Sequence, residues 1–507
     1  MEFNPLEEPG QLSGIINPCI IVIFGATGDL TAKKLMPALY NLAKDGGLPA
    51  QFACVGFARR PKSHEEFRAE AKAAISKHSR TKPIDETLWA QFQEHIFYHT
   101  SEFHEEKGYV ELREFLSDLD NRFGTAGNRI FYLSTQPSFF TTICDKLHST
   151  GLIYEEGGEK WSRIIIEKPF GHDYDSAVAL QKDLMSFAKE DQIYRIDHYL
   201  GKETVQNLLV FRFANLFFES VWNNRYIDHI QITMAEDIGI GTRGNFWEEA
   251  GLLRDILQNH VMQLLSLVAM EPPVSLDANA IRDEKVKVLQ ALRPLTEVDL
   301  KEHVVRGQYV PGFVNGSPVI GYTEEDKVSK TSVVETYMAL QLHIDNWRWQ
   351  GVPFYLRSGK RLPKKVTEIA VVFKDPPAVL FQQGGKKNEQ NVLAIRIQPD
   401  EGISLKINCK VPGPSSPIQP VKMDFLYGTY FGMAPPEAYE RLICDCILGD
   451  STLFAREDEV LASWKFVTPI LTYWAKQQNL ATYPSGSWGP KEADEMIAKD
   501  GRKWRLL

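Results

Sequence analysis

The chain has 507 residues, 43% hydrophobic and 24% charged, which is typical of a globular protein with two domains or one large domain. Its net charge of −9 disfavours nucleic acid or an anionic membrane as the main partner, since either would favour a basic surface. The six cysteines form no CxxC pair, which predicts free thiols in a reducing compartment. The sequence shows no signal-peptide pattern and no apolar run near the roughly 20 residues that span a bilayer. We therefore expect a cytoplasmic protein.

Short apolar segments alternate with amphipathic helical segments in the first part of the chain. Candidate strands occupy residues 19–24, 52–57, 129–134 and 163–171. Strands that alternate with helices imply right-handed crossovers and a parallel sheet. The pattern predicts an α/β domain over residues 17–197.

The pattern changes after about residue 228, where strand-like segments follow one another without a helix between each pair. In ISLKINCKV (403–411), apolar and polar residues alternate strictly, which predicts a strand with one buried and one wet face. The preceding VLAIRIQ (392–398) is joined to it by PDEG, a plausible hairpin turn. We predict a larger α+β domain with a mainly antiparallel sheet over residues 198–507.

A glycine turn, GATGDL, lies between the first strand and the first helix. In this context a glycine turn binds a dinucleotide pyrophosphate, because the backbone can approach closely and the helix N-terminus offers N–H donors. Thr31 stands where the usual fingerprint has a third glycine, so an ordinary tight strand–helix turn remains the alternative. The residues predicted to bind the cofactor here are Gly25, Ala26, Thr27, Gly28, Asp29 and Leu30.

Arg59 favours NADP over NAD as the cofactor. The second strand ends in Ala58-Arg59-Arg60, with no acidic residue before Glu65. An NAD site usually places a carboxylate here for the ribose 2′-hydroxyl, whereas an NADP site needs a cation for the 2′-phosphate. The alternative is a pair of solvated arginines.

Five longer motifs extend this interpretation to the whole chain. They are GATGDL, EKPFG (167–171), RIDHYLGKE (195–203), RDILQNH (254–260) and RSGK (357–360). In order and spacing they resemble the glucose-6-phosphate dehydrogenase family, over residues of about 18–504. The resemblance implies a Rossmann-like NADP-binding domain, a cis peptide between Lys168 and Pro169, and oxidation of D-glucose 6-phosphate to 6-phosphoglucono-1,5-lactone without a metal.

The resemblance also implies a catalytic pair, with His260 as the base and Asp197 as the carboxylate that orients it. Imidazole titrates near the working pH, and a carboxylate on its far nitrogen fixes the tautomer and stabilises the imidazolium. Taken alone, His260 falls in an apolar helical stripe and would more often be a core histidine. On an α-helix, Asp255 would lie about 140° around the axis from His260.

The remaining substrate contacts follow from the resemblance residue by residue. It assigns the phosphate to His198, Tyr199 and Lys202, because a dianion needs several donors and a cation. It assigns the sugar hydroxyls to Glu236 and Asp255. The further contacts are three lysines, each of which alone could be a solvated charge: Lys168, shared with the coenzyme site, Lys360 and Lys365.

Three further expectations complete the hypothesis. A homodimer or homotetramer is expected. Val366 and Ala370 stand where the resemblance expects basic residues for a second, structural NADP, although Arg396, Lys406 and Trp504 match, so we do not expect that nucleotide. The alternatives are a sugar oxidoreductase of the glucose–fructose oxidoreductase type and a non-catalytic sugar-phosphate or NADP sensor.

Overall fold

The computed structural model describes residues 17–154, 159–377, 389–413, 418–432 and 436–507. This described part of the chain divides into two compact units, which we call unit 1 and unit 2. Unit 1 contains the residues up to Lys202 together with Pro273–Asp283 and Pro436–Leu461. Unit 2 contains Glu203–Pro272, Glu284–Pro435 and Ala462–Leu507.

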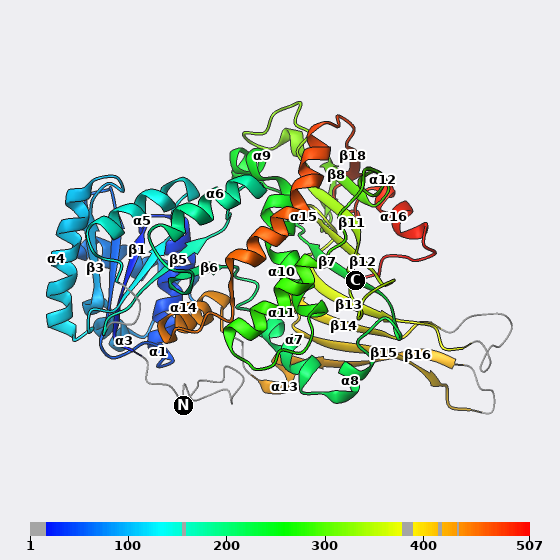
Figure 1. Cartoon of the computed structure of the whole chain (residues 1–507), viewed down its shortest axis with the longest axis horizontal. Helices are drawn as coiled ribbons and strands as arrows, with labels where there is room; N and C mark the ends of the chain where they lie inside the picture. The colour runs from blue at the N-terminus through cyan, green and yellow to red at the C-terminus, as the bar shows by residue number, and fades with distance from the viewer. Residues whose placement is uncertain (1–16, 155–158, 378–388, 414–417, 433–435) are drawn as a thin grey trace. The chain divides into compact units, whose positions relative to one another are not determined.

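Unit 1 is built on a seven-stranded sheet, counted over the described residues and called sheet A (Figure 1). Its pairs are parallel except for the pair of β17 with β6, which is antiparallel. In spatial order the strands are β17 (Phe454–Ala455), β6 (Ile193–Ile196), β5 (Ser162–Glu167), β4 (Arg129–Leu133), β1 (Cys19–Phe24), β2 (Phe52–Ala58) and β3 (Ile96–Thr100).

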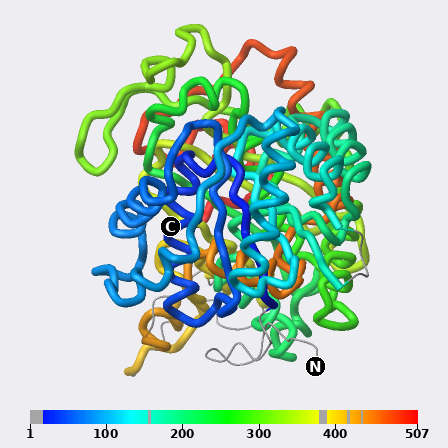
Figure 2. Tube along the Cα trace, turned by 90° about the vertical axis from the view of Figure 1, so that its left-hand side faces the viewer, coloured from blue at the N-terminus to red at the C-terminus, as the bar shows by residue number. Residues whose placement is uncertain are grey.

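Helices flank sheet A on both sides, as Figure 2 shows for the blue and cyan segments. One group contains α1 (Met36–Lys44), α2 (His64–His78), α3 (Glu86–Phe92) and α14 (Ala438–Leu448); the other contains α4 (Glu106–Phe123), α5 (Phe140–Ser149) and α6 (Tyr174–Met185). The shorter helical segments are η1 (Thr31–Leu35), η2 (Gln93–His95), η3 (Pro137–Phe139) and η4 (Glu190–Gln192). This arrangement confirms the predicted parallel α/β fold.

Unit 2 is built on a nine-stranded, mainly antiparallel sheet, counted over the described residues and called sheet B. Two of its pairs are parallel, β12 with β7 and β18 with β8. The order is β16 (Ile418–Leu426), β15 (Gly402–Lys410), β14 (Val392–Gln398), β13 (Val366–Phe373), β7 (Ile227–Ala235), β12 (Pro353–Gly359), β11 (Tyr337–His343), β8 (Val304–Val310) and β18 (Ala481–Pro484). A small separate sheet pairs β9 (Gly312–Val314) with β10 (Ser317–Val319). The predicted α+β class with an antiparallel sheet is confirmed.

The helices of unit 2 include the segment that carries His260. They are α7 (Glu203–Phe213), α8 (Leu216–Val221), η5 (Gly241–Arg243), α9 (Gly244–Leu252), η6 (Leu253–Val261), α10 (Met262–Ala269), α12 (Glu297–Glu302), η7 (Tyr322–Glu324), α13 (Tyr427–Phe431) and α16 (Lys491–Ala498). Two further helices, α11 (Ala278–Gln290) and α15 (Glu457–Ala475), include residues of both units.

The alternating segment 403–411 forms a strand as predicted, but its apolar face is not buried. Ile403, Leu405 and Ile407 are only half-buried in β15, while Ser404 on the opposite face is 2% exposed. The predicted hairpin with β14 is present. The expectation of a buried apolar face was wrong, because the apolar side chains of β15 lie on the more exposed face of the strand and the covered face carries Ser404.

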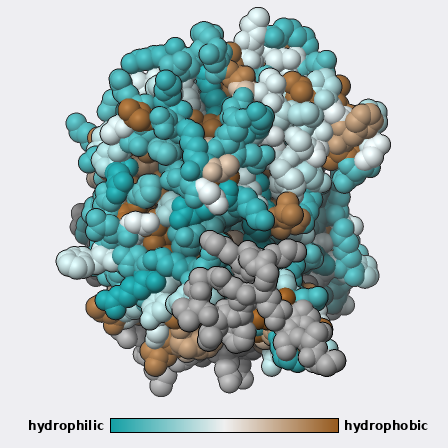
Figure 3. Space-filling view, turned by 90° about the vertical axis from the view of Figure 1, so that its right-hand side faces the viewer, coloured by the Kyte–Doolittle hydropathy of each residue, from teal (hydrophilic) through white to brown (hydrophobic). Residues whose placement is uncertain are grey.

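Among the described residues, no helix is long and apolar enough to cross a membrane. The face of the molecule drawn in Figure 3 is mostly hydrophilic, with scattered hydrophobic residues.

An ion-pair network at the start of β7 anchors the end of the chain to sheet B. The Asp228 carboxylate accepts hydrogen bonds from Arg502 Nε at 2.9 Å and Arg502 Nη2 at 3.0 Å, and it lies 2.6 Å from His229 Nδ1. Burial opposes ionisation of Asp228, but the hydrogen bonds to His229 and Arg502 outweigh it and hold the pKa of Asp228 well below its usual range.

We predict that Asp228→Asn lowers the free energy of unfolding of unit 2 at pH 7, by about 1.5–3 kcal/mol for a bond to a charged group. A depressed pKa contributes stability above the unfolded value of about 3.9, and that contribution disappears as the pH falls toward the folded value. Calorimetric melting at pH 7, 4 and 3 should therefore show the difference between variant and parent shrinking with acid. Asp345→Asn is the control, because the Asp345–Arg293 pair is about half exposed, and it should change stability little at any pH.

Candidate active site

The glycine turn lies where the strand order of sheet A reverses, since β2 and β4 flank β1 on opposite sides. Ligands of open parallel sheets bind at the carboxyl ends of the strands at such a point. Gly25 has φ +81°, and a Cβ on it would lie 2.2 Å from the carbonyl oxygen of Ser134, so no other residue fits there. The Gly28 N–H donates to the Gly25 carbonyl at 2.9 Å and closes the turn. The cradle therefore fits a dinucleotide pyrophosphate.

The residue in place of the third glycine has a role of its own. Thr31 is 1% exposed and its hydroxyl donates to the Gly25 carbonyl at 3.4 Å. It opens η1, a five-residue π-helical turn that continues into α1. On the neighbouring strand, Arg59 is exposed directly after β2.

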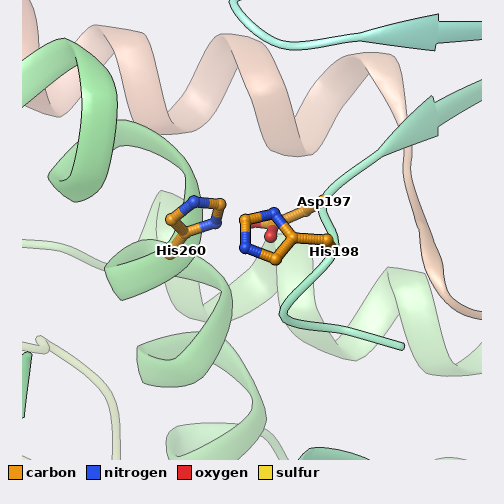
Figure 4. A group of neighbouring side chains, drawn as sticks. All are labelled: Asp197, His198 and His260. Atoms are coloured by element: carbon orange, nitrogen blue, oxygen red, sulfur yellow. The ribbon is translucent and has the colours of Figure 1, made fainter. Parts of the chain in front are cut away.

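The motif RIDHYLGKE forms the end of β6 and the turn that follows it. Figure 4 draws Asp197 and His198 on this turn of unit 1 and His260 on η6 of unit 2. Asp197 is 2% exposed, and its Oδ1 accepts the backbone N–H of Tyr199 at 2.9 Å, which fixes the turn. The predicted catalytic pair is thus divided between the two units.

Three side chains of the turn, those predicted to bind phosphate, gather beside one another. The His198 and Tyr199 rings lie 5.1 Å apart, and Lys202 Nζ lies 5.3 Å from the centre of the Tyr199 ring. His198 also stacks on Tyr439 of α14, with centroids 6.3 Å apart and the planes within 6°. The turn therefore presents an imidazole, a phenol and an ammonium together, which is a donor set suited to a dianion.

Arg195, which belongs to the same motif, has a structural position instead. It is 0% exposed, and its guanidinium bonds to both carboxylate oxygens of Glu190, at 2.6 and 2.8 Å. Arg195 therefore links β6 to the preceding segment η4.

The Lys168–Pro169 peptide at the end of β5 is cis, as the family resemblance predicts. The residue before it, Glu167, accepts a hydrogen bond from the Tyr132 hydroxyl at 2.6 Å and another from Tyr439. Removal from water raises the pKa of Glu167 to about 7, and the nearby Asp197 adds to the rise, against the hydrogen bonds and Lys168. Lys168 therefore stands beside a carboxyl group that titrates near neutral pH.

Three predicted residues follow or precede neighbouring strands of sheet B at the same end of those strands. Strands β7 and β12 are parallel, with Ala235 opposite Gly359, so Glu236 and Lys360 directly follow the adjacent C-terminal ends of the two strands. Lys360 is 1% exposed and forms an ion pair with Glu236. Lys365 is exposed and precedes Val366, which pairs with Ala235 from the other side.

The helix that carries His260 is not an α-helix. Residues Leu253–Val261 form η6, a π-helix, which is rare and often occurs at functional sites. Its hydrogen bonds join residues five apart, so Asp255 and His260 lie about one turn apart on one face. The 140° separation expected for an α-helix was wrong. His260 is 1% exposed, and Asp255 is half-buried.

The residues considered for a second nucleotide have partners within unit 2. Arg396 pairs with Asp424, and Lys406 with Glu389 at 3.0 Å. The guanidinium of Arg357 lies 4.6 Å from the Trp504 ring centre. Val366 and Ala370 are buried in β13.

Three aromatic residues of these sites were not predicted from the sequence. Tyr132 and Tyr439 bracket Glu167, and Trp247 of α9 lies 4.9 Å beneath Lys360 Nζ. For Tyr132 and Tyr439, the position of Glu167 inside the motif EKPFG was the available signal, since a carboxylate beside a site lysine needs donors. Trp247 carried no local signal.

The chain is similar to known proteins over nearly its whole length. Family models described as "Glucose-6-phosphate dehydrogenase, NAD binding domain" and "Glucose-6-phosphate dehydrogenase, C-terminal domain" match residues 22–207 and 209–505. A Chlamydia pneumoniae protein named glucose-6-phosphate 1-dehydrogenase is 56% identical over 497 residues, which cover 97% of this chain and 96% of that protein. A Bacillus subtilis protein of the same name is 48% identical over 486 residues, covering 96% and 98%.

A solved structure has the same fold throughout. Its title is "Glucose-6-phosphate dehydrogenase in complex with its substrate glucose-6-phosphate", and it is 37% identical, with a TM-score of 0.89 and coverage of 97% of this chain and 99% of that one. Matches of this extent to both halves of the fold place the chain in an oxidoreductase family: it belongs to the glucose-6-phosphate dehydrogenase family.

Proposed function

We propose that this protein oxidises the C1 hydroxyl of D-glucose 6-phosphate to 6-phosphoglucono-1,5-lactone with NADP⁺, as the first step of the oxidative pentose phosphate pathway. The observation that carries the proposal is the family match over nearly the whole chain, to relatives that bear the name of this activity and to a structure with glucose 6-phosphate. The glycine cradle and the donor cluster after β6 supply sites for the two reactants.

In the proposed mechanism, His260 removes the proton of the C1 hydroxyl as hydride leaves C1. The glycine turn at Gly25 and Gly28 would hold NADP⁺, which would supply the hydride acceptor. Asp197 holds the tautomer of His260 and stabilises the imidazolium that forms. A positioned base of this kind typically contributes about 10²–10⁴ in rate. His260 lies on a buried helix, which limits its motion and supports this role.

The proposed substrate contacts divide by chemistry. His198, Tyr199 and Lys202 hold the phosphate, because together they offer donors and a positive charge. Glu236 and Asp255 accept hydrogen bonds from sugar hydroxyls. Three lysines complete the proposed substrate contacts: Lys168, which is shared with the coenzyme, Lys360 and Lys365.

We also propose that the protein is a homo-oligomer. The half-buried apolar row Ile403, Leu405 and Ile407 of β15 continues across the strand pair, where Leu405 lies opposite Met423 and Ile407 opposite Val421. Met423 is 52% exposed and Val421 is 40% exposed. A second copy that covers this face would bury an apolar surface that the single chain leaves in contact with water.

A cytoplasmic location is the accompanying proposal. All six cysteines lie within the described residues and are free thiols, which fits a reducing compartment.

We predict NADPH production with glucose 6-phosphate, much less with unphosphorylated glucose, and almost none by His260→Asn. The variant should lose at least a hundredfold in kcat while still binding glucose 6-phosphate, because its amide cannot take the proton. Absorbance of NADPH measures the rate, and calorimetric titration measures binding. Equal activity with glucose would favour a sugar oxidoreductase of another type, and binding without turnover by the native protein would favour a sensor.

Arg59→Ala should raise the KM for NADP by roughly tenfold or more and leave the KM for NAD nearly unchanged, since only NADP carries a 2′-phosphate. The matched control is Arg60→Ala, the adjacent exposed arginine, which should change neither value appreciably. If Arg59→Ala weakened both cofactors equally, Arg59 would support the turn and not recognise the phosphate.

Lys202→Ala and Asp197→Asn should separate binding from chemistry within the turn after β6. Lys202→Ala should raise the KM for glucose 6-phosphate by the equivalent of about 1.5–3 kcal/mol, typical of a hydrogen bond to a charged group. Asp197→Asn should mainly lower kcat, because the imidazolium loses its support. Unphosphorylated glucose is the internal control, since its kcat/KM should respond little to Lys202→Ala. A loss shared equally by glucose would assign Lys202 a structural role.

A further inference from the structure

A sharp break in the backbone separates α9 from η6, the π-helix that carries Asp255 and His260. At the break, Gly251 has φ +62° and ψ −178°, which lies outside the helical region. The helix η6 therefore begins anew at Leu253, and its first backbone N–H groups need acceptors from outside the helix. Whatever holds this start also fixes where both site residues point.

The acceptor at this start is the carboxylate of Glu335, 82 residues further along the chain. Its Oε1 accepts the Leu253 N–H at 3.1 Å, and the residue is 7% exposed. The carboxylate lies so close to the non-helical Gly251 that a Cβ on this residue would be 2.5 Å from the same Oε1. The glycine and the glutamate are therefore complementary, since the first provides the space that the second occupies.

The backbone at Glu335 is tied to the other functional residue of unit 2, Lys360. The Glu335 carbonyl accepts the indole N–H of Trp247 at 3.2 Å, and the face of that indole lies 4.9 Å from Lys360 Nζ. The next carbonyl, that of Thr336, accepts the backbone N–H of Lys360 at 2.9 Å. One dipeptide thus contacts both the start of η6 and the strand end that bears Lys360.

We propose that Glu335 is a positioning residue: it caps the π-helix η6 and so sets the placement of Asp255 and His260 relative to Lys360. The assignment rests on the proposed function for its catalytic meaning, but the cap itself is a structural claim that can be tested without substrate. Glu335 does not touch the reacting atoms and acts through the helix that it holds.

The chemistry at Glu335 agrees with this role. Burial raises the pKa of Glu335, while the hydrogen bond from the Leu253 N–H opposes the rise. A carboxyl group that serves only to fill space would be unfavourable in this position, because a buried polar group without partners destabilises the fold. The helix N-terminus provides the compensating donor.

We predict that Glu335→Ala lowers kcat at least tenfold and raises the KM for glucose 6-phosphate severalfold, while the KM for NADP stays within about twofold. The reason for the split is that η6 carries the proposed sugar and base residues, whereas the glycine turn belongs to unit 1. Without substrates, hydrogen–deuterium exchange of the backbone amides of residues 253–261 should quicken in this variant. The exchange tests the cap even if the native protein does not oxidise glucose 6-phosphate, so failure of the proposed function remains distinguishable.

Conservative variants decide the matter if Glu335→Ala does not fold. Glu335→Gln keeps an oxygen at the position of Oε1 and should retain kcat within about threefold. Glu335→Asp is one methylene shorter, cannot reach the Leu253 N–H, and should resemble the alanine variant. Glu368→Gln is the matched control, because Glu368 is another buried carboxyl of unit 2, 5% exposed and paired with Arg505 at 2.7 Å; kcat and exchange in η6 should not change.

The inference is overturned if folded Glu335→Ala, or Glu335→Asp in its place, shows native exchange in residues 253–261 together with native kcat. It is also overturned if Glu335→Gln loses as much activity as Glu335→Asp, because the acceptor at Leu253 would then not be the function of the side chain. A loss of kcat in Glu368→Gln equal to that in Glu335→Ala would show a general response to removing buried charge and would contradict the assignment as well.

Discussion

The parallel pairing of β7 with β12, inside a sheet that is otherwise mainly antiparallel, is the constraint on which the proposed substrate contacts Glu236 and Lys360 depend. If the two strands were antiparallel, Glu236 and Lys360 would lie at opposite ends of the strand pair, whereas the parallel pairing places them at the same end. Lys365 joins them because β13 runs the opposite way and begins where β7 ends. The long connection that parallel strands require contains the helices α9, η6 and α10, so the fold that joins the two strands also supplies His260.

Unit 1 also has its candidate site residues at strand ends, but there nearly all the strands are parallel. The parallel strands of sheet A have their C-terminal ends on the same side of the sheet. Four features directly follow such ends: the glycine turn, Arg59, Lys168 and the turn after β6. Close approach is permitted there by glycine, at Gly25 against Ser134. In both units, therefore, the candidate site residues lie at strand ends, where irregular backbone can expose N–H groups and long side chains.

The fold class was predictable from local patterns, since strand–turn–helix order is a local property of the chain, whereas most of the candidate site residues came from the family resemblance of the longer motifs. Contacts between distant segments were not. Tyr439 reaches Glu167 from 272 residues away in the sequence, and Glu335 reaches Leu253 across 82 residues. Nothing in the spacing distinguishes Arg195, a structural cation, from Lys202 a few residues later. The π-helical geometry of η6 was also missed, because the apolar stripe of an α-helix and of a π-helix look alike over nine residues.

The ion pair of Lys360 with Glu236 has a consequence for the polarity of substrate binding. Its two charges offset one another, so the pair offers an uncharged ligand hydrogen bonds, and the net positive charge beside it comes from the exposed Lys365. The turn after β6 carries an ammonium on Lys202 beside an imidazole and a phenol, with the opposite preference. The two surfaces therefore differ in the kind of ligand group that each favours: a hydroxyl at the Lys360–Glu236 pair and an anion at the turn after β6.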